Sequence, residues 1–359
     1  MTPTLRRHAS DITTEWLTEI LRGAGSIIDA SVTSFETTPV GTGQMADSVR
    51  FRLDYDKEEL GAPVSVIVKL AAADDTSRAT AVVLGSYETE VCFYQQVAPT
   101  VDISLPRCHF ADIDADGGWF TLVLEDLAPA VPGDQLAGCS VDDAALALSQ
   151  LAKLHTPRWG DRTLAELPWL HRNTPERVKF GAELIAGLLP GFIDRYADEL
   201  DAELICLGER LMPKIEAWMT DHPQPWTVQH GDYRLDNMLF GGPASRRPLA
   251  VVDWQTATYG PPLADASYFL GAGLVEKDRR THERDLLREY YQALNASGIE
   301  GYSWQRCWSD YRRFTLAGFL MAVGASMLVE RTSRGDEMFM TMARRHGAHI
   351  LDLEAEDLL

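Results

Sequence analysis

The sequence predicts an α+β protein with a small, sheet-rich N-terminal lobe and a larger, mainly helical C-terminal lobe. The chain has 359 residues with 45% hydrophobic content, which is long for one compact domain and favours two. Up to about Pro132 most segments have the apolar alternation or β-branched runs of strands, whereas most later segments have helical spacing. A block of strands followed by a block of helices is typical of the α+β class.

The N-terminal part is predicted as a sheet with two helices. The first helix runs from Asp11, its expected N-cap, to Leu21 and is stopped by Gly23 and Gly25. The second spans roughly residues 79–98. Five strands are expected, the last two joined by the turn sequence DADGG: 32–40, 48–55, 64–70, 106–113 and 119–124.

The C-terminal part is predicted to be mostly helical. Helical spacing extends over residues 142–155, 176–189, 193–219, 263–273, 278–296, 304–329 and 336–353. Three short strands are expected at 226–229, 238–240 and 249–252. The predicted division is therefore an N-terminal lobe of residues 1–127, a connection at about 124–130 and a C-terminal lobe of residues 131–359.

The charge of the chain restricts its partners. Its formal net charge is −20 and its pI is about 4.8. Such a surface repels phosphate backbones and anionic lipids, so we expect neither nucleic-acid nor membrane binding. The charge fits an ordinary acidic soluble protein, and an acidic cleft for a cationic substrate is the alternative. The sequence does not indicate the oligomeric state.

Other features favour the cytoplasm. The N-terminus lacks the apolar core of a signal peptide. The longest near-apolar run, 316–329, is shorter than the ~20 residues that cross a bilayer, so we expect a buried helix there. The cysteines are odd in number, widely spaced and without a CxxC pair, which predicts reduced thiols: Cys92, Cys108, Cys139, Cys206 and Cys307.

The strongest chemical signal is the segment HGDYRLDN at 230–237. It places a carboxylate, Asp232, five residues before an amide, Asn237. Kinases use such a pair for phosphoryl transfer, the Asp orienting or accepting the proton of the attacking hydroxyl and the Asn holding Mg²⁺. A second segment, LAVVDWQ, brings Asp253 to the end of an apolar strand, where it can bind Mg²⁺ that bridges phosphates.

Together, HGDYRLDN and the following VVDWQ resemble the aminoglycoside phosphotransferase family, and the related choline kinase and ecdysteroid-kinase-like families. The resemblance covers roughly residues 32–270. It implies a bilobal protein-kinase-like fold and an enzyme that uses ATP and Mg²⁺ to phosphorylate a hydroxyl of a small molecule. It leaves open the acceptor, antibiotic resistance and the choice between ATP and GTP.

The resemblance also predicts nucleotide-binding residues in the N-terminal lobe. Gly41, Thr42 and Gly43 lie between the first two expected strands, where a loop would cover the phosphates. Lys69 is the expected strand lysine. Its partner glutamate would come from the next helix, and we prefer Glu90 to Glu88 because Glu90 falls on the apolar face of that helix, where a carboxylate needs a cation.

The adenine site in this family lies on the connection between lobes. The family pattern would use the backbone carbonyl of Glu125 and the backbone amide of Leu127. Arg234, two residues after Asp232, has two readings. It stabilises charge on the transferred phosphoryl group, or it forms a structural salt bridge with Asp236 or Asp265.

Three further polar residues are assigned structural roles. We expect His230 and His155 to pack and organise the loop. Asp265 is expected to brace the same loop from a helix N-terminus, with helix capping as the alternative. Trp304, Trp308 and Tyr311 share a helical face, which predicts core packing, with an aromatic substrate wall as the alternative.

The sequence also departs from other enzyme classes. It contains no HRD, DFG or APE string, and eleven residues separate Asp253 from Asp265, too few for an activation segment that holds a peptide substrate. P-loop, HExxH and GxSxG motifs are absent as well. A small-molecule kinase is therefore the first hypothesis. A nucleotide-binding pseudokinase or regulatory module is the alternative.

Overall fold

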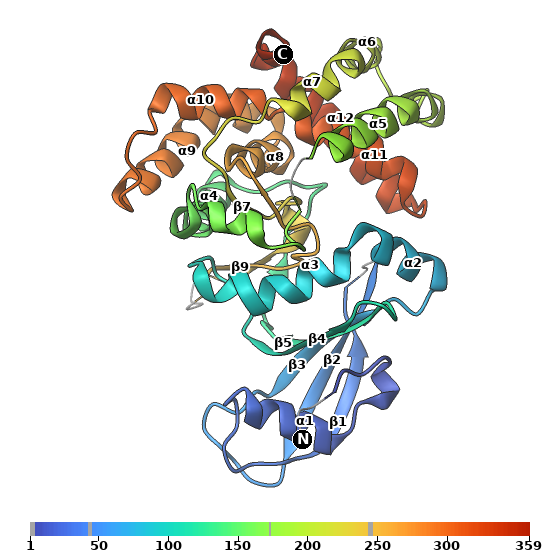
Figure 1. The fold of residues 1–359 in the computed structure, drawn as a ribbon, viewed down its shortest axis with the longest axis vertical. Coiled ribbons are helices and arrows are strands. Elements are labelled where there is room, and N and C mark those ends of the chain that lie inside the picture. Colours follow the sequence, from blue (N-terminus) through green and yellow to red (C-terminus); the bar gives the residue numbers. More distant parts are fainter. Residues whose placement is uncertain (1–3, 42–44, 172–173, 243–246) are drawn as a thin grey trace. The chain divides into compact units, whose positions relative to one another are not determined.

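The computed structural model describes residues 4–41, 45–171, 174–242 and 247–359. The chain divides into two compact units (Figure 1). Unit 1 contains residues 1–100, 104–131 and 250–256, and unit 2 contains residues 101–103, 132–249 and 257–359. Unit 1 is built on an antiparallel sheet and unit 2 is mainly helical, which confirms the predicted α+β class.

The sheet of unit 1 has five strands in the order β1-β2-β3-β5-β4. Every neighbouring pair is antiparallel. The strands are β1 (Val32–Pro39), β2 (Ala46–Tyr55), β3 (Ser65–Ala71), β4 (Cys108–Asp114) and β5 (Trp119–Glu125). In this register Lys69 of the central strand β3 lies opposite Ser48 on one side and Leu122 on the other.

Two helices cover opposite faces of this sheet (Figure 1). On one face α1 (Thr14–Gly23) contributes Trp16, Leu17 and Leu21 to a buried cluster with Val66 and Val68 of β3. On the other face α3 (Ser86–Cys92) contacts β4 and β5. Because side chains alternate along a strand, Lys69 points away from the α1 core and toward the α3 face.

The predicted N-cap of the first helix was wrong. Thr13 caps α1, its hydroxyl accepting a hydrogen bond from the backbone N–H of Trp16 at 3.2 Å. Asp11 instead closes a short 3₁₀ turn at Ala9–Asp11, where its carboxylate accepts from the His8 N–H at 3.0 Å. Both residues are good N-caps, and the 3₁₀ turn moves the N-cap by two residues, from Asp11 to Thr13.

The single helix predicted over 79–98 was also wrong. The segment forms α2 (Asp75–Leu84), α3 and a π-helical turn at Phe93–Val97. Gly85 separates the first two because it adopts a left-handed conformation with φ 71°, which glycine allows without steric strain. The reorientation at Gly85 sets the direction of α3, which carries Glu90.

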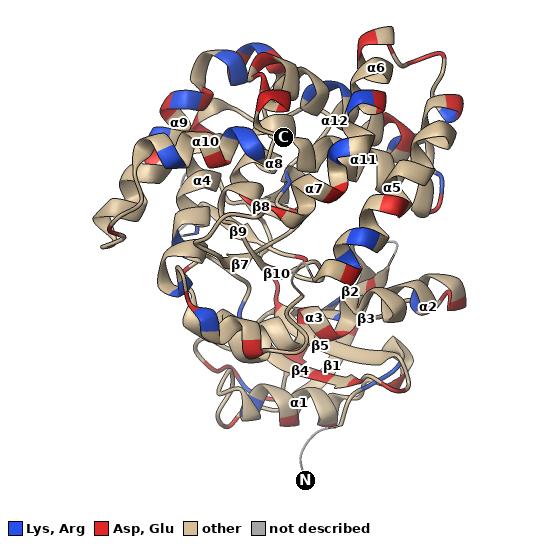
Figure 2. Ribbon diagram, turned by 45° about the horizontal axis from the view of Figure 1, so that its top comes forward, with Lys and Arg blue, Asp and Glu red and all other residues tan. Residues whose placement is uncertain are grey.

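Unit 2 consists of helices around the nearly fully buried α8. It pairs α11 with α12 and α4 with α9, and α8 contacts both pairs. Charges of both signs run along the outer helices (Figure 2). The helices are α4 (Val141–His155), α5 (Pro175–Arg195), α6 (Ala202–Leu211), α7 (Ile215–Thr220), α8 (Leu263–Gly273), α9 (Glu276–Ala296), α10 (Trp304–Arg313), α11 (Leu316–Leu328) and α12 (Ser333–Asp352). None of the helices in the described ranges has the length and apolarity that a bilayer span requires.

Three predicted helices in unit 2 differ from the structure. The one predicted over 193–219 is divided into the end of α5, α6 and α7. α5 continues through Pro190 to Arg195, although proline disfavours a helix interior, because packing against α11 outweighs the local preference. The helix predicted over 304–329 is divided at Phe314 and Thr315, both buried. Neither residue is a helix breaker, so tertiary packing sets this boundary.

Short strands complete the structure. β7 (Thr227–Gln229) pairs antiparallel with β10 (Thr258–Gly260), a strand that the sequence did not predict. A separate three-stranded sheet has the order β6-β8-β9, formed by β6 (Val131–Pro132), β8 (Met238–Phe240) and β9 (Leu249–Val251). The loop 230–237 therefore runs from the end of β7 to the start of β8.

Candidate active site

Unit 1 contains a buried lysine between two carboxylates. The Nζ atom of Lys69 lies 2.6 Å from Oε2 of Glu90 and 2.6 Å from Oδ1 of Asp253. Burial lowers the pKa of Lys69, but Asp253 and Glu90 outweigh that effect, so the pKa is raised and the ammonium stays charged. Glu90 is buried and Glu88 is exposed, so the structure pairs Lys69 with the glutamate on the apolar helix face.

Asp253 is held in a strained backbone conformation just after β9. Its φ is 68°, in the left-handed region, which costs about 1–3 kcal/mol for a residue with a side chain. Its Oδ2 accepts a hydrogen bond from Nε2 of Gln255 at 3.0 Å. The next residue, Trp254, stacks on Phe93 with centroids 3.9 Å apart and planes at 4°. This stacking anchors the turn that directs the Asp253 carboxylate at Lys69.

The structure describes some of the other residues of unit 1 that are expected to bind the nucleotide. Gly41 follows β1 with φ 78°, and Thr42 and Gly43 lie outside the described residues. In the described part of the chain the Leu127 N–H has no hydrogen-bond acceptor, while its carbonyl accepts from Ala130 at 2.9 Å. Glu125 is fixed by backbone contact with Arg107, whose carbonyl accepts from its N–H at 2.8 Å.

The cavity described in unit 1 lies away from this lysine. It has a volume of about 480 Å³ and is lined by Arg7–Ser10 and by the β1, β2 and β3 ends next to Gly41. Its lining includes Leu70 but not Lys69, Glu90 or Asp253. The charged groups around the Lys69 ammonium therefore do not line this cavity.

In unit 2, Asp265 braces the loop 230–237. Its carboxylate accepts hydrogen bonds from the backbone N–H groups of His230 at 2.7 Å and Gly231 at 3.0 Å. Asp265 is 2% exposed and lies in the first turn of α8. Asp265 therefore braces the loop, as the sequence predicts, because both of its carboxylate oxygens accept hydrogen bonds from the loop backbone.

Both histidines near this brace have structural contacts. His230 is fully buried, and its Nδ1 accepts from the Asp232 N–H at 3.3 Å. His155 is also fully buried, with Nε2 3.5 Å from Oδ2 of Asp265 and Nδ1 2.8 Å from the hydroxyl of Tyr290. These contacts hold the start of the loop against α4, α8 and α9.

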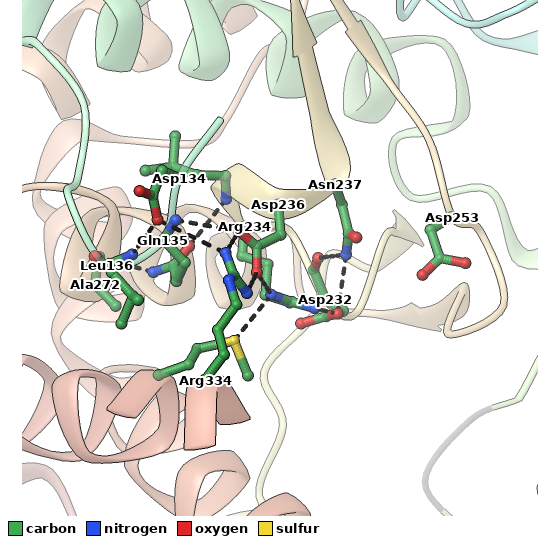
Figure 3. Close-up of polar contacts among 12 residues, drawn as sticks. Asp134, Gln135, Leu136, Asp232, Arg234, Asp236, Asn237, Asp253, Ala272 and Arg334 are labelled. Carbon is green, nitrogen blue, oxygen red and sulfur yellow. Dashed lines mark hydrogen bonds and ion pairs between the residues drawn. The ribbon is translucent and has the colours of Figure 1, made fainter. Parts of the chain in front are cut away.

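Asp232 is surrounded by hydrogen-bond donors. Its Oδ2 accepts from Nε of Arg234 and from Nδ2 of Asn237, both at 2.9 Å (Figure 3). Its Oδ1 accepts from the hydroxyl of Tyr268 at 2.8 Å. Sequence reasoning missed Tyr268. The available signal was its position three residues after Asp265 on the same helix, which puts both on one face.

Arg234 joins two carboxylates of the loop. Besides Asp232 it contacts Asp236, with Nη1 2.5 Å from Oδ2, and the sulfur of Met338 at 3.4 Å (Figure 3). Asp265 is not among its partners in the described residues. Burial lowers the pKa of Arg234, but Asp232, Tyr268 and Asp236 together raise it by more, so the net shift is upward. The salt-bridge reading of Arg234 therefore has a structural basis with Asp236, and the guanidinium also directly contacts Asp232.

The second half of the loop is fixed by Gln135, another residue that the sequence did not reveal. Gln135 is 1% exposed. Its Oε1 accepts from the Leu235 N–H at 3.0 Å, and its own N–H donates to Oδ1 of Asp236 at 3.1 Å. Arg345 of α12 donates to the carbonyls of Gln135 and Leu136 at 3.1 and 2.8 Å. Segments about a hundred residues apart thus hold one short loop, which sequence spacing does not show.

Each unit offers oxygen atoms of the kind that a hard divalent cation binds. Asp253 offers carboxylate oxygens, and Asn237 offers an amide oxygen, both of the kind that Mg²⁺ prefers. Nδ2 of Asn237 binds the carbonyl and the carboxylate of Asp232 at 2.9 Å. In the described residues Oδ1 of Asn237 accepts no hydrogen bond, so this oxygen is available as a ligand.

Comparison with known proteins decides the family. A model described as "Phosphotransferase enzyme family" matches residues 46–307. The chain belongs to the phosphotransferase enzyme family. The resemblance that the sequence indicates is thereby confirmed. The match contains Lys69, Glu90, the loop 230–237 and Asp253, and it ends in α10, so α11 and α12 lie outside it.

Solved structures share the fold of this phosphotransferase family member. A choline kinase from Cryptosporidium parvum Iowa II aligns with a TM-score of 0.56 at 10% identity over 96% of both chains. An ethanolamine kinase from Plasmodium vivax aligns with 0.53 at 10% identity over 92% of this chain and 86% of the other. A GDP complex of an aminoglycoside 2'-phosphotransferase-IIIa mutant gives 0.52 at 14% identity over 96% and 99%. The kinase-like fold class is therefore confirmed.

Curated relatives match over a short stretch. The mouse acyl-CoA dehydrogenase family member 10 is 42% identical over 60 residues, 16% of this chain and 6% of its own length. The chicken acyl-CoA dehydrogenase family member 11 is 39% identical over 61 residues, 16% of this chain and 8% of its own length. The chain therefore spans only a small part of these relatives.

Proposed function

We propose that this protein is an ATP- and Mg²⁺-dependent phosphotransferase that transfers the γ-phosphoryl group to a hydroxyl of a small molecule. Membership of the phosphotransferase enzyme family supports the reaction class. The observation that carries the proposal is the Asp232 carboxylate, which is held by Arg234, Asn237 and Tyr268 and keeps 20% exposure of its side chain. A carboxylate so oriented and still accessible can accept the proton of an attacking hydroxyl.

Each unit is assigned part of the reaction. Residues 1–127 bind the nucleotide, with Gly41, Thr42 and Gly43 over the phosphates and Glu125 and Leu127 at the adenine. Lys69, kept charged beside Glu90, pairs with the α- and β-phosphates. Residues 131–359 supply the catalytic loop and the acceptor site. Asp253 serves the nucleotide site, in keeping with its grouping in unit 1.

The metal belongs to the same proposal. Asn237 and Asp253 would hold Mg²⁺, which when bound neutralises charge on the β- and γ-phosphates. Asp232 takes the hydroxyl proton, and Arg234 orients Asp232 through the bond from Nε to Oδ2. The positive charge of Arg234 also stabilises negative charge on the transferred phosphoryl group next to Asp232.

The acceptor is proposed to be a small molecule because the eleven residues between Asp253 and Asp265 leave no platform for a peptide. The printed names of structurally similar proteins suggest a first panel: choline, ethanolamine and an aminoglycoside. We also propose a cytoplasmic location, because the cysteines are free thiols.

The deciding experiment is an acceptor screen followed by ADP release from Mg-ATP, with Mg-GTP in parallel and with EDTA and Asp232→Asn as controls. Acceptor-dependent ADP release that disappears in both controls supports the proposal. Nucleotide binding without turnover on any acceptor would instead favour the pseudokinase alternative. Stoichiometric phosphorylation of a protein at a defined Ser or Thr would contradict the substrate class.

A further inference from the structure

The hydrogen bonds on Asp232 divide unequally between its two oxygens. Oδ2 accepts two, from Arg234 and Asn237, whereas Oδ1 accepts one, from Tyr268. A carboxylate has about four acceptor positions, two on each oxygen. Among the described residues three of the four are therefore filled, and the remaining one is on Oδ1. The oxygen that can still accept a proton is the one that Tyr268 holds.

Tyr268 is itself fixed in place. It lies on α8, one turn after Asp265, and is 6% exposed. Its ring stacks on the imidazole of His346 from α12, with centroids 5.5 Å apart and planes at 27°. The hydroxyl therefore reaches Asp232 from an element outside the loop 230–237, while the other two donors belong to that loop.

Two glycines make room for the imidazole that supports Tyr268. A Cβ added at Gly271 of α8 or at Gly318 of α11 would collide with the His346 ring. Burial lowers the pKa of His346 well below its ordinary value, so the ring is neutral. Within the described ranges neither ring nitrogen has a hydrogen-bond partner. His346 thus acts as an uncharged packing surface for the Tyr268 ring.

We propose that Tyr268 is a positioning residue for phosphoryl transfer, which holds Oδ1 of Asp232 so that its open acceptor position meets the hydroxyl of the acceptor. The inference rests on the proposed function, which assigns proton transfer to Asp232. Tyr268 acts through Asp232 and needs no contact with the acceptor or the nucleotide. Its removal frees the carboxylate to rotate and leaves the Lys69 cluster in unit 1 unchanged.

The test is Tyr268→Phe, which deletes the hydroxyl and keeps the ring on His346. Turnover, measured as ADP release from Mg-ATP with the acceptor found in the screen, should fall about ten- to a hundredfold, the range for a hydrogen bond to a charged group. The KM for Mg-ATP and its binding affinity should stay within about twofold. A loss confined to kcat indicates positioning, because a general loss of structure would alter both.

Tyr302→Phe is the matched control. The Tyr302 hydroxyl also donates to an aspartate, Oδ2 of Asp310, at 2.8 Å, and Tyr302 is 7% exposed. This variant removes an equivalent bond in unit 2, without contact with Asp232. Its kcat should match that of the wild type. If both variants lost kcat equally, the effect would be structural and the inference would be overturned.

A double-mutant cycle with Asp232→Asn tests the route of the effect. Tyr268→Phe should cause no further loss in the Asp232→Asn background, and an undiminished loss there overturns the inference. If Tyr268→Phe keeps the turnover of the wild type while Asp232→Asn is inactive, this inference is overturned but the proposed function is not. Full turnover of Asp232→Asn, or no wild-type turnover with any acceptor, overturns the proposed function and this inference with it. If Tyr268→Phe does not fold, His346→Ala must show a kcat-specific loss instead.

Discussion

The Lys69 cluster, formed by Lys69, Glu90 and Asp253, and the loop 230–237 each hold a charged side chain in place, but by different kinds of contact. Lys69 is held by two opposite charges, Glu90 and Asp253, each 2.6 Å away. Asp232 is held mainly by the orientation of hydrogen bonds, including one from the neutral Tyr268. The first arrangement depends on charge balance, and the second on exact placement of helices. Substitutions in the two regions should therefore fail in different ways.

The largest effect is expected for Asp232→Asn. The amide keeps the shape of the side chain but no longer takes a proton, and general base catalysis typically contributes ~10²–10⁴ in rate. Turnover should fall by that factor while Mg-ATP affinity, measured by calorimetry, stays near the wild-type value. A variant that retains full turnover with the identified acceptor would remove Asp232 from the mechanism.

Lys69→Ala should fail in nucleotide binding instead. Loss of a charged donor to the phosphates should weaken Mg-ATP binding by about ten- to a hundredfold, although the protein remains folded. It also leaves Glu90, 2% exposed, without its cation, which should lower the free energy of unfolding by about 3 kcal/mol. Calorimetry and urea unfolding measure the two effects.

A second variant separates these two consequences. Lys69→Met combined with Glu90→Gln removes both charges of the pair, so stability should largely return while Mg-ATP binding stays weak. Recovery of nucleotide affinity in this double variant would show that Lys69 acts only as a structural counter-ion. Unchanged affinity in Lys69→Ala would do the same.

Acid should destabilise both units through buried histidines, including one in each unit whose pKa is lowered to about 4. Burial lowers the pKa of His109 in unit 1 and of His222 in unit 2 to about 4. The unfolded chain binds these protons near pH 6.5 and the folded chain does not, so stability is complete above pH 6.5 and falls between pH 6.5 and 4. Each histidine should contribute up to about 3 kcal/mol of this loss.

His109→Gln and His222→Gln should therefore each flatten the pH dependence of the unfolding free energy between pH 4 and 6.5. If the unfolding free energy changed with pH equally in the wild type and in both variants, the assignment of this pH dependence to His109 and His222 would be wrong. A change in only one variant would identify which unit limits stability in acid.

The smallest effect is expected for Arg334→Ala. Arg334 lies 3.3 Å from Asp236 and 3.7 Å from Asp134, but its side chain is 53% exposed. Exposed pairs contribute about 0–1 kcal/mol, so stability and kcat should change little. Asp236→Asn should have the larger effect because it also weakens the ion pair with Nη1 of Arg234, whose side chain is 20% exposed. Equal effects on stability would mean that the exposed Arg334–Asp236 pair contributes as much as the Arg234–Asp236 pair.

The comparison also explains what the sequence could predict. The family resemblance implies Lys69 and a partner glutamate on the next helix. The choice of Glu90 follows from a local rule, because a carboxylate on an apolar helix face needs a cation. The helix break at Gly85 was overlooked although glycine is visible in the sequence. Gln135 and Tyr268 were missed for a different reason. Their side chains contact residues 100 and 36 positions away, and no periodicity connects them.

The membership of residues 250–256 in unit 1 has a consequence for synthesis of the chain. Lys69 and Asp253 are separated by 184 positions, and a ribosome adds about 5–20 residues per second. Roughly 10–40 seconds therefore pass between the two residues. During that interval Lys69 has Glu90 as its counter-ion but not Asp253. Unit 1 reaches its complete set of contacts only after about half of unit 2 has been made.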